Sequence, residues 1–231
     1  MPEAPAASLP WRRWNVTPRE AVALQRCAAL AIEPVDRLGD ITTIAGVDVA
    51  YGARGRGATA RAAAVLLDLA TLVVLGESVI EMPATFPYVP GLLTFREAPA
   101  AVAAIEALPV RPDLLLCDGQ GIAHPRRCGV ASHLGLALDL PTIGVAKSRL
   151  IGRHVDPAPH KGAWTPLLDN DDQIGVCLRT KAGVKPLFVS IGHRVSLQTA
   201  VHIVLHCSTR WRLPEPTRLA DRLSKCRRPD A

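Results

Sequence analysis

Apolar positions at the start of this chain follow a helical spacing. Thr17 is suited to cap a helix, Pro18 to its first position and Glu20 to its third. From Ala21 onward, apolar side chains recur every three or four residues. This spacing predicts a helix that extends to about Ala31.

Three apolar runs then follow one another with short links. They span residues 41–52, 60–68 and 72–81, with Gly55 and Gly57 in the first link. Short apolar runs separated by turn residues are typical of hairpin strands. We therefore expect an antiparallel meander of three strands.

Helices and strands alternate in the middle of the chain. Residues 85–93 contain two prolines and a glycine, which disfavour regular structure. After them the pattern predicts a helix from Leu92 or Thr94 through Leu108, a buried strand from Leu114, a helix over 128–139 and a strand over 140–146. The order β-β-β-α-β-α-β predicts an α/β fold, in which helices flank a mixed sheet of a meander and parallel strands.

The last third of the chain has weaker patterns. They predict strands over 174–179 and 187–191, a helix over 197–207, and a final helix that starts within 213–217.

No repeat or Gly/Ser linker divides the sequence. We therefore expect one domain over residues 17–225, between an N-terminal tail, 1–16, and a basic C-terminal tail, 226–231.

Composition and charge narrow the classes of protein. The chain has 231 residues, of which 48% are hydrophobic, which favours a folded protein with a buried core over a disordered one. The net charge of +6 favours an anionic partner, with nucleic acid as the first candidate. The six cysteines form no Cys-x-x-Cys pair, which argues against a zinc site and a disulfide framework. No signal peptide or membrane span is recognisable, so we expect a cytoplasmic protein.

Two aspartates stand where buried strands would carry them. Asp118 directly follows the apolar run at Leu114 and precedes Gly119 and Gly121, which allow close approach of a backbone or ligand. Asp48 interrupts the first apolar strand, on the same side as small residues such as Gly46, which leave room beside the carboxylate. If the two strands are neighbours, the carboxylates repel each other unless a divalent cation holds them, and oxygen ligands favour Mg²⁺ or Mn²⁺ over zinc. The alternative is an edge strand with Asp48 facing water.

Other polar residues have a functional and a plain interpretation. Glu97 is either a third oxygen donor or a charge that complements a helix dipole. Asp221 is either a fourth carboxylate or a helix-surface acid. Lys147 lies just past a buried strand. It contacts a phosphate, supplies a positive charge opposite the carboxylates, or is a plain surface lysine. His124 is a phosphate donor, a proton carrier or a turn residue.

Tyr88 stands between two prolines in the irregular segment. An exposed Tyr in such a stiff loop is suited to stack on a nucleobase. The alternative is a loop Tyr packed on the core.

Four motifs together resemble the endonuclease V family of deoxyinosine-directed repair nucleases. They cover most of the chain from Thr17 to about Leu223, and they are residues 44–49 (IAGVDV), 87–97 (PYVPGLLTFRE), 118–127 (DGQGIAHPRR) continuing to 144–147 (GVAK), and 213–218 (LPEPTR). The resemblance implies an RNase H-like fold, in agreement with the element order.

The resemblance also implies roles for individual residues. Asp48 and Asp118 would bind Mg²⁺, and Mn²⁺ would be able to replace it. Glu97 and Asp221 would complete the acidic site, and Lys147 would lie near the phosphate at which the strand is cut. Tyr88 would be a wedge in the gap left by a displaced base. The remaining substrate-binding residues implied are Pro90, Gly91, Leu93, Gly119, Gly121, His124, Gly129 and Leu150. Gln120 departs from the histidine of many relatives, which affects a contact beside the site and not a metal ligand.

The implied reaction is hydrolysis of the second phosphodiester 3′ to deoxyinosine, with 3′-hydroxyl and 5′-phosphate ends. Inosine-containing RNA is an open alternative substrate, because the sequence does not report how a 2′-hydroxyl is treated. Two further alternatives are a structure-selective nuclease of the same fold, acting on junctions or flaps, and a basic nucleic-acid-binding protein without catalysis. We expect a monomer with no membrane partner.

Overall fold

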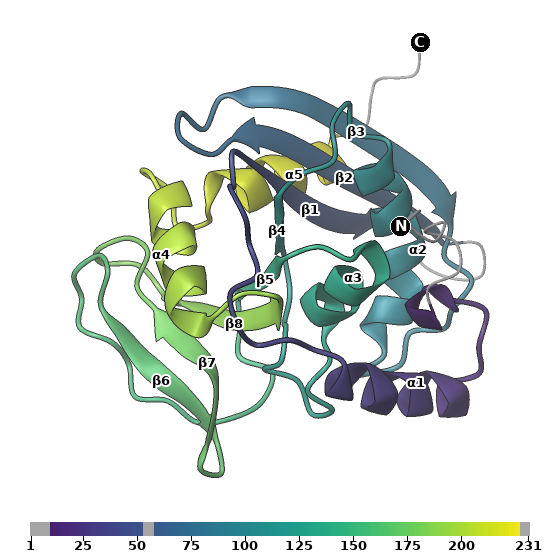
Figure 1. Cartoon of the computed structure of the whole chain (residues 1–231), viewed down its shortest axis with the longest axis horizontal. Helices are drawn as coiled ribbons and strands as arrows, with labels where there is room; N and C mark the ends of the chain where they lie inside the picture. The colour runs from purple at the N-terminus through teal and green to yellow at the C-terminus, as the bar shows by residue number, and fades with distance from the viewer. Residues whose placement is uncertain (1–9, 53–57, 227–231) are drawn as a thin grey trace.

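A single sheet of eight strands forms the centre of the computed structural model, which describes residues 10–52 and 58–226 (Figure 1). The strands are β1 (Thr43–Tyr51), β2 (Thr59–Asp68), β3 (Val74–Pro83), β4 (Leu114–Cys117), β5 (Thr142–Ala146), β6 (Trp164–Asp169), β7 (Asp172–Leu178) and β8 (Leu187–His193). Their order across the sheet is β3-β2-β1-β4-β5-β8-β7-β6. The strands β1, β4 and β5 pair in parallel, and every other neighbouring pair is antiparallel.

The predicted mixed sheet is confirmed, with two corrections. The alternative that Asp48 lies on an edge strand is wrong, because β1 is paired on both sides. Strand β6 was not predicted. Its sequence contains Pro166 and begins with the exposed Trp164, and a strand with a proline is tolerated at an edge such as this one. The predicted turn at Gly55 and Gly57 lies outside the described residues.

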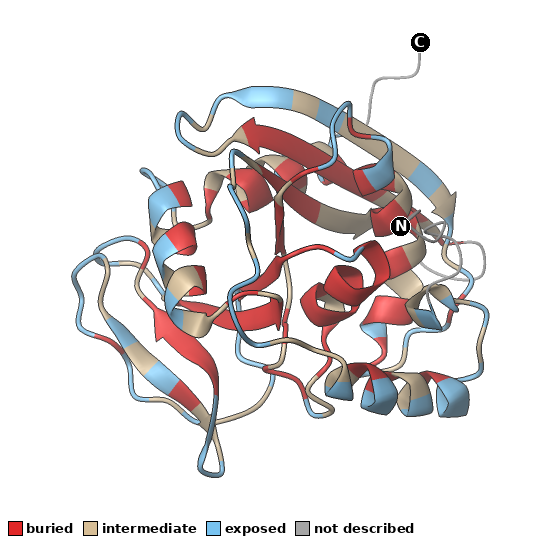
Figure 2. Cartoon of the chain, viewed as in Figure 1, coloured by how far each residue is buried: buried red, intermediate tan, exposed pale blue. Residues whose placement is uncertain are grey.

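Helices cover both faces of the sheet. They are α1 (Pro18–Leu30), α2 (Leu93–Glu106), α3 (Val130–Leu138), α4 (Leu197–Cys207) and α5 (Glu215–Lys225), after a short 3₁₀ turn η2 (Pro10–Arg12). Helices α2 and α3 pack on one face, and α4 and α5 on the other. Strands β4, β5 and β8, in the middle of the sheet, are buried throughout (Figure 2).

Helix α1 begins as its sequence predicts. The Thr17 hydroxyl accepts a hydrogen bond from the Glu20 backbone N–H, and the Glu20 carboxylate accepts one from the Thr17 backbone N–H. This capping box stabilises the first turn. Just before it, Trp14 packs against Phe95 and His133.

Within the described residues, no helix has both the length and the apolar character needed to cross a membrane.

The parallel register between β1 and β4 places the two predicted aspartates side by side. Val47 is paired with Cys117, so Asp48 and Asp118 are the next residues on neighbouring strands. Lys147 follows the adjacent parallel strand β5. The carboxyl ends of parallel strands in an open α/β sheet are where ligands commonly bind.

Candidate active site

Three carboxylates from distant parts of the chain converge at this end of the sheet. Asp48 comes from β1, Asp118 from the end of β4 and Asp221 from α5. One oxygen from each lies within 4.8 Å of the others. Asp221 is therefore part of the acidic group and not an isolated acid on the helix surface.

Basic and hydroxyl side chains hold this group in place. Lys147 Nζ lies 2.5 Å from Asp118 Oδ2 and 2.6 Å from Asp221 Oδ1. Lys225 Nζ lies 2.7 Å from Asp221 Oδ1, and the Ser224 hydroxyl donates to Asp48 Oδ2. Although partial burial opposes the effect, hydrogen bonds from the two lysines lower the pKa of Asp221. Lys147 thus places its positive charge opposite the carboxylates, as one of the interpretations of the sequence predicted.

Glu97 approaches the acidic group from α2 on the other side. Burial, with repulsion from Asp48 and Asp118, raises the pKa of Glu97 to about 8. Its Oε1 lies 3.5 Å from the Tyr51 hydroxyl. Glu97 is not one of the three acids whose oxygens meet within 4.8 Å. Its effect on the site is therefore electrostatic in this conformation.

The three converging aspartates fit a hard divalent cation. Burial raises the pKa of Asp48 to about 6, and repulsion from Asp118 and Asp221 adds to it, against the hydrogen bond from Ser224. Carboxylates that repel one another are stabilised by a cation among them. A set of oxygen donors favours Mg²⁺ or Mn²⁺ over softer metals.

Metal affinity should rise with pH. Because Asp48 and Glu97 have raised pKa values of about 6 and 8, protons compete with the cation, and this competition weakens as the pH rises through that range. Mg²⁺ titration by calorimetry in buffers of different ionisation enthalpy should detect proton release near neutral pH. The variant Glu97→Gln should show a smaller pH dependence. Equal Mg²⁺ affinity at both ends of the range would contradict this prediction.

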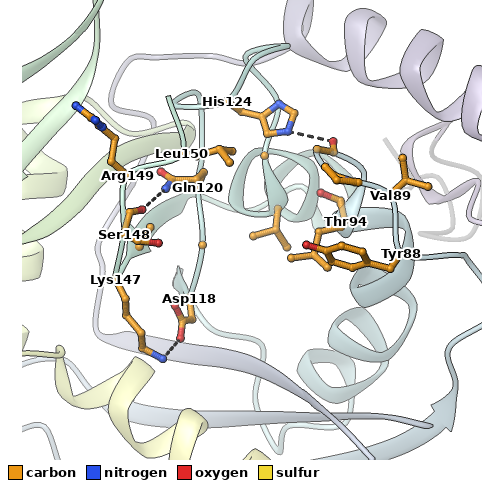
Figure 3. Close-up of a pocket in the computed structure, with 17 residues that line it drawn as sticks. Tyr88, Val89, Thr94, Asp118, Gln120, His124, Lys147, Ser148, Arg149 and Leu150 are labelled. Carbon is orange, nitrogen blue, oxygen red and sulfur yellow. Dashed lines mark hydrogen bonds and ion pairs between the residues drawn. The ribbon is translucent and has the colours of Figure 1, made fainter. Parts of the chain in front are cut away.

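A cavity of about 410 Å³ opens beside the acidic group. Figure 3 shows its two walls, with Tyr88, Val89 and Thr94 on one side and Lys147, Ser148 and Arg149 on the other. Eight of the predicted substrate-binding residues line it: Tyr88, Pro90, Gly91, Leu93, Gly119, His124, Gly129 and Leu150. A cavity of this size is in the range of small-molecule pockets.

Gly121, the ninth, does not line the cavity. A Cβ atom at Gly121 would lie 1.9 Å from the Ile191 carbonyl oxygen, so the glycine allows the loop after β4 to lie against β8. Its backbone N–H donates to the Ser190 hydroxyl. The role of Gly121 in this structure is to position Asp118, Gly119 and Gln120.

Tyr88 is 72% exposed. The alternative that it packs on the core is therefore wrong. The loop that carries it is anchored by buried Phe86 and Leu92 on either side. An exposed aromatic ring thus lines the cavity (Figure 3).

His124 is held inside the cavity wall. Its Nδ1 accepts from the Arg126 backbone N–H, so Nε2 donates to the Gly91 carbonyl at 3.1 Å. Burial lowers the pKa of His124 to about 4, and the charge of Arg126 adds to this. Both nitrogens are engaged in this structure, which favours the interpretation of His124 as a turn residue.

Sequence reasoning did not find the partners that hold Gly91. Its carbonyl also accepts from Gln25 and Arg126, and the Gln25 side-chain oxygen accepts from Arg126 Nε at 2.6 Å. Gln25 is a polar residue, but it is fully buried, on the face of α1 that packs against the rest of the protein. A lone Gln within an amphipathic helix gives no signal of this contact.

Both the sequence and the fold of this chain are similar to those of known proteins. The family model described as Endonuclease V matches residues 27–222. The protein named endonuclease V from Roseiflexus sp. is 52% identical over 91% of this chain and 93% of its own length. The crystal structure of endonuclease V from Streptomyces avermitilis has 46% identity and a TM-score of 0.87, covering 92% of this chain and 93% of that one. Endonuclease V of Ciona intestinalis, solved with a DNA 24mer containing an inosine followed by a ribo-adenosine, has 29% identity and a TM-score of 0.77, covering 90% and 95%.

Proposed function

This chain belongs to the endonuclease V family of metal-dependent nucleases, and we propose that it nicks DNA at deoxyinosine, at the second phosphodiester on the 3′ side of the lesion. The observation that carries the proposal is the position of the cavity. It shares Asp118 and Lys147 with the acidic group, so a base in the cavity would place its own strand across the carboxylates.

Each element of the site has a part in the proposed reaction. Asp48, Asp118 and Asp221 would hold Mg²⁺, for which Mn²⁺ is a substitute. A bound divalent cation supplies Lewis-acid stabilisation of a phosphodiester and favours ionisation of water. Lys147 places positive charge next to the position of the phosphate, and Glu97 adds a carboxyl that can take up a proton near neutral pH.

The cavity would receive the displaced base. Gly91, Gly119 and Gly129 line the cavity, and Leu93 and Leu150 provide exposed apolar surface. A base out of the stack is recognised by contacts to its edge and by stacking. The acidic group and the cavity are both formed by a single chain, which supports action as a monomer.

The test is nicking of matched duplexes that differ only in inosine or adenine. With Mg²⁺, the inosine strand should be cut once, and sequencing-gel mobility should place the cut one nucleotide 3′ of the lesion with a 5′-phosphate end. Removal of Mg²⁺ by a chelator should stop the reaction. Branched DNA without inosine should remain intact, and equal cutting of it would favour the structure-selective alternative.

Inosine-containing RNA is a second candidate substrate. In the Ciona intestinalis complex the inosine is followed by a ribo-adenosine. A 2′-hydroxyl is therefore present in the strand of that relative's ligand, beside the inosine. Parallel assays with inosine DNA, inosine RNA and DNA carrying one ribonucleotide after the inosine will rank the three substrates.

Replacing Tyr88 by Ala should weaken binding of inosine DNA by about 5- to 150-fold, because stacking on an aromatic side chain is worth roughly 1–3 kcal/mol per base. The ring is exposed and lies at the mouth of the cavity, so its loss leaves the core unchanged. Fluorescence anisotropy gives the affinity, and Tyr88→Phe is the matched control that keeps the ring. Equal affinity of Tyr88→Ala and the unmodified protein would remove the wedge.

A further inference from the structure

A second cluster of potential metal ligands lies outside the acidic group. It consists of His154, Asp156 and Cys177, each of which offers one ligand atom within 4.8 Å of the other two. His154 and Asp156 belong to the segment between β5 and β6, and Cys177 lies in β7. His154 Nε2 is 3.5 Å from Asp156 Oδ1.

The histidine has an unsatisfied polar atom. His154 Nδ1 is buried and has no hydrogen-bond partner among the described residues. The ring is fixed edge-on against Phe188, with 5.0 Å between the ring centroids. A buried polar atom without a partner carries a desolvation cost and calls for an explanation such as an ion.

The cluster also contains a thiol. Burial raises the pKa of Cys177, so a metal ion would have to displace the thiol proton. Cys177 is fully buried, and its neighbours in this small cluster of the core are apolar, including Ile174 and Phe188. Asp156 is 80% exposed at the side chain, so it closes the cluster on the solvent side and is free to adjust.

We propose that His154, Asp156 and Cys177 bind a zinc ion. A nitrogen, a sulfur and an oxygen donor form a set that zinc accepts, whereas Mg²⁺ takes oxygen ligands. Three protein ligands leave the fourth position of zinc for water. The absence of a Cys-x-x-Cys pair speaks only against zinc sites built from cysteines that are close together in the sequence. Here the fold brings Cys177 to a His-x-Asp segment.

The zinc would fasten the segment that carries one wall of the cavity. Lys147 begins this segment, Leu150 lines the cavity, and Arg153 pairs with Leu168 of β6 in an isolated bridge. His154 comes next, so the ion would join the end of the segment to β7. This ion would be separate from the cation of the acidic group near Lys147, which has its own ligands.

The experiment measures zinc retention by the metal-stripped full-length protein. The protein is dialysed against Zn²⁺ with Mg²⁺ in large excess, which occupies the acidic group, and zinc is then counted per chain. One zinc per chain should remain. Competition with a chromophoric chelator should show at least about tenfold weaker zinc binding by Cys177→Ser, His154→Gln and Asp156→Asn, since even loss of a residue that only supports a ligand costs 10–100-fold. Because Asp156 is mostly exposed, Asp156→Asn tests the site without risk to folding.

Two controls identify the ligands. Cys27→Ser removes an exposed thiol and should leave zinc affinity unchanged. Substitution by Co²⁺ should give a thiolate-to-cobalt charge-transfer band that Cys177→Ser abolishes and Cys27→Ser does not. Unchanged zinc affinity in Asp156→Asn and Cys177→Ser, or loss of the zinc in Asp118→Asn, would overturn the proposal. No DNA is present, so this result is independent of the nicking assays.

Discussion

The variant Asp118→Asn is expected to nick inosine DNA about 10³-fold more slowly than the unmodified protein while it keeps its fold and its affinity for the lesion. Asp118 is one of the three acids whose oxygens converge, and it also holds Lys147. Loss of its charge removes a metal ligand and leaves the lysine paired with Asp221 alone. A divalent cation supplies several kcal/mol of stabilisation, and about 4 kcal/mol corresponds to a factor of about 10³.

Binding and chemistry have to be measured apart in this experiment. Single-turnover nicking gives the rate, and fluorescence anisotropy with inosine duplexes gives the affinity. Asp171→Asn is the matched control, because Asp171 is a fully exposed acid in the turn between β6 and β7. Full nicking activity of Asp118→Asn would end the metal hypothesis, and a comparable loss in Asp171→Asn would show a non-specific effect of charge.

The sheet and the central pair of acids are predictable from the sequence, because both depend on local patterns. Apolar runs with short links give the meander, and an acid at the end of a buried strand marks a position that needs compensation. Asp48 and Asp118 become neighbours through the parallel register of β1 and β4. The sequence gives these two strands and their acids, whereas the pairing and the register that bring the acids together are seen only in the structure.

The contacts around the cavity are not predictable in the same way. Gln25 and Arg126 are 101 positions apart in sequence and meet at Gly91 only after α1 docks beside the loop that follows β4. Strand β6 was missed because Pro166 weakens the strand pattern that its edge position tolerates. Each of these features depends on tertiary packing, which overrides local preference.

The position of Asp221 shows the same limit. From the sequence it was either a fourth carboxylate or a surface acid, because an isolated helix does not report what it packs against. The structure resolves the choice through Gly46, which was interpreted as leaving room beside Asp48. Backbone atoms of Pro216 at the start of α5 occupy that room. The glycine thus lets α5 lie against β1 and carry Asp221 to the other acids.

The variant Gly46→Ala should therefore lose both stability and nicking activity. A Cβ atom there would lie 2.1 Å from the Pro216 carbonyl carbon and oxygen and 2.7 Å from the Thr217 nitrogen. These are backbone atoms, so the clash is relieved only if α5 moves away from β1. Overpacking of this kind typically lowers the free energy of unfolding by about 1–3 kcal/mol. The movement would also separate Asp221 and Ser224 from Asp48, whose carboxylate accepts a hydrogen bond from the Ser224 hydroxyl.

Gly52→Ala is the matched control for this variant. Gly52 directly follows the same strand, and a Cβ atom there would meet nothing closer than the Thr59 carbonyl oxygen at 3.8 Å, an ordinary contact. Urea unfolding gives the stability of both variants, and calorimetry gives their Mg²⁺ affinity. If α5 is positioned through Gly46, then Gly46→Ala loses Mg²⁺ affinity together with stability, whereas Gly52→Ala keeps both. Indistinguishable variants would mean that Asp221 reaches the acidic group without this close contact between helix and strand.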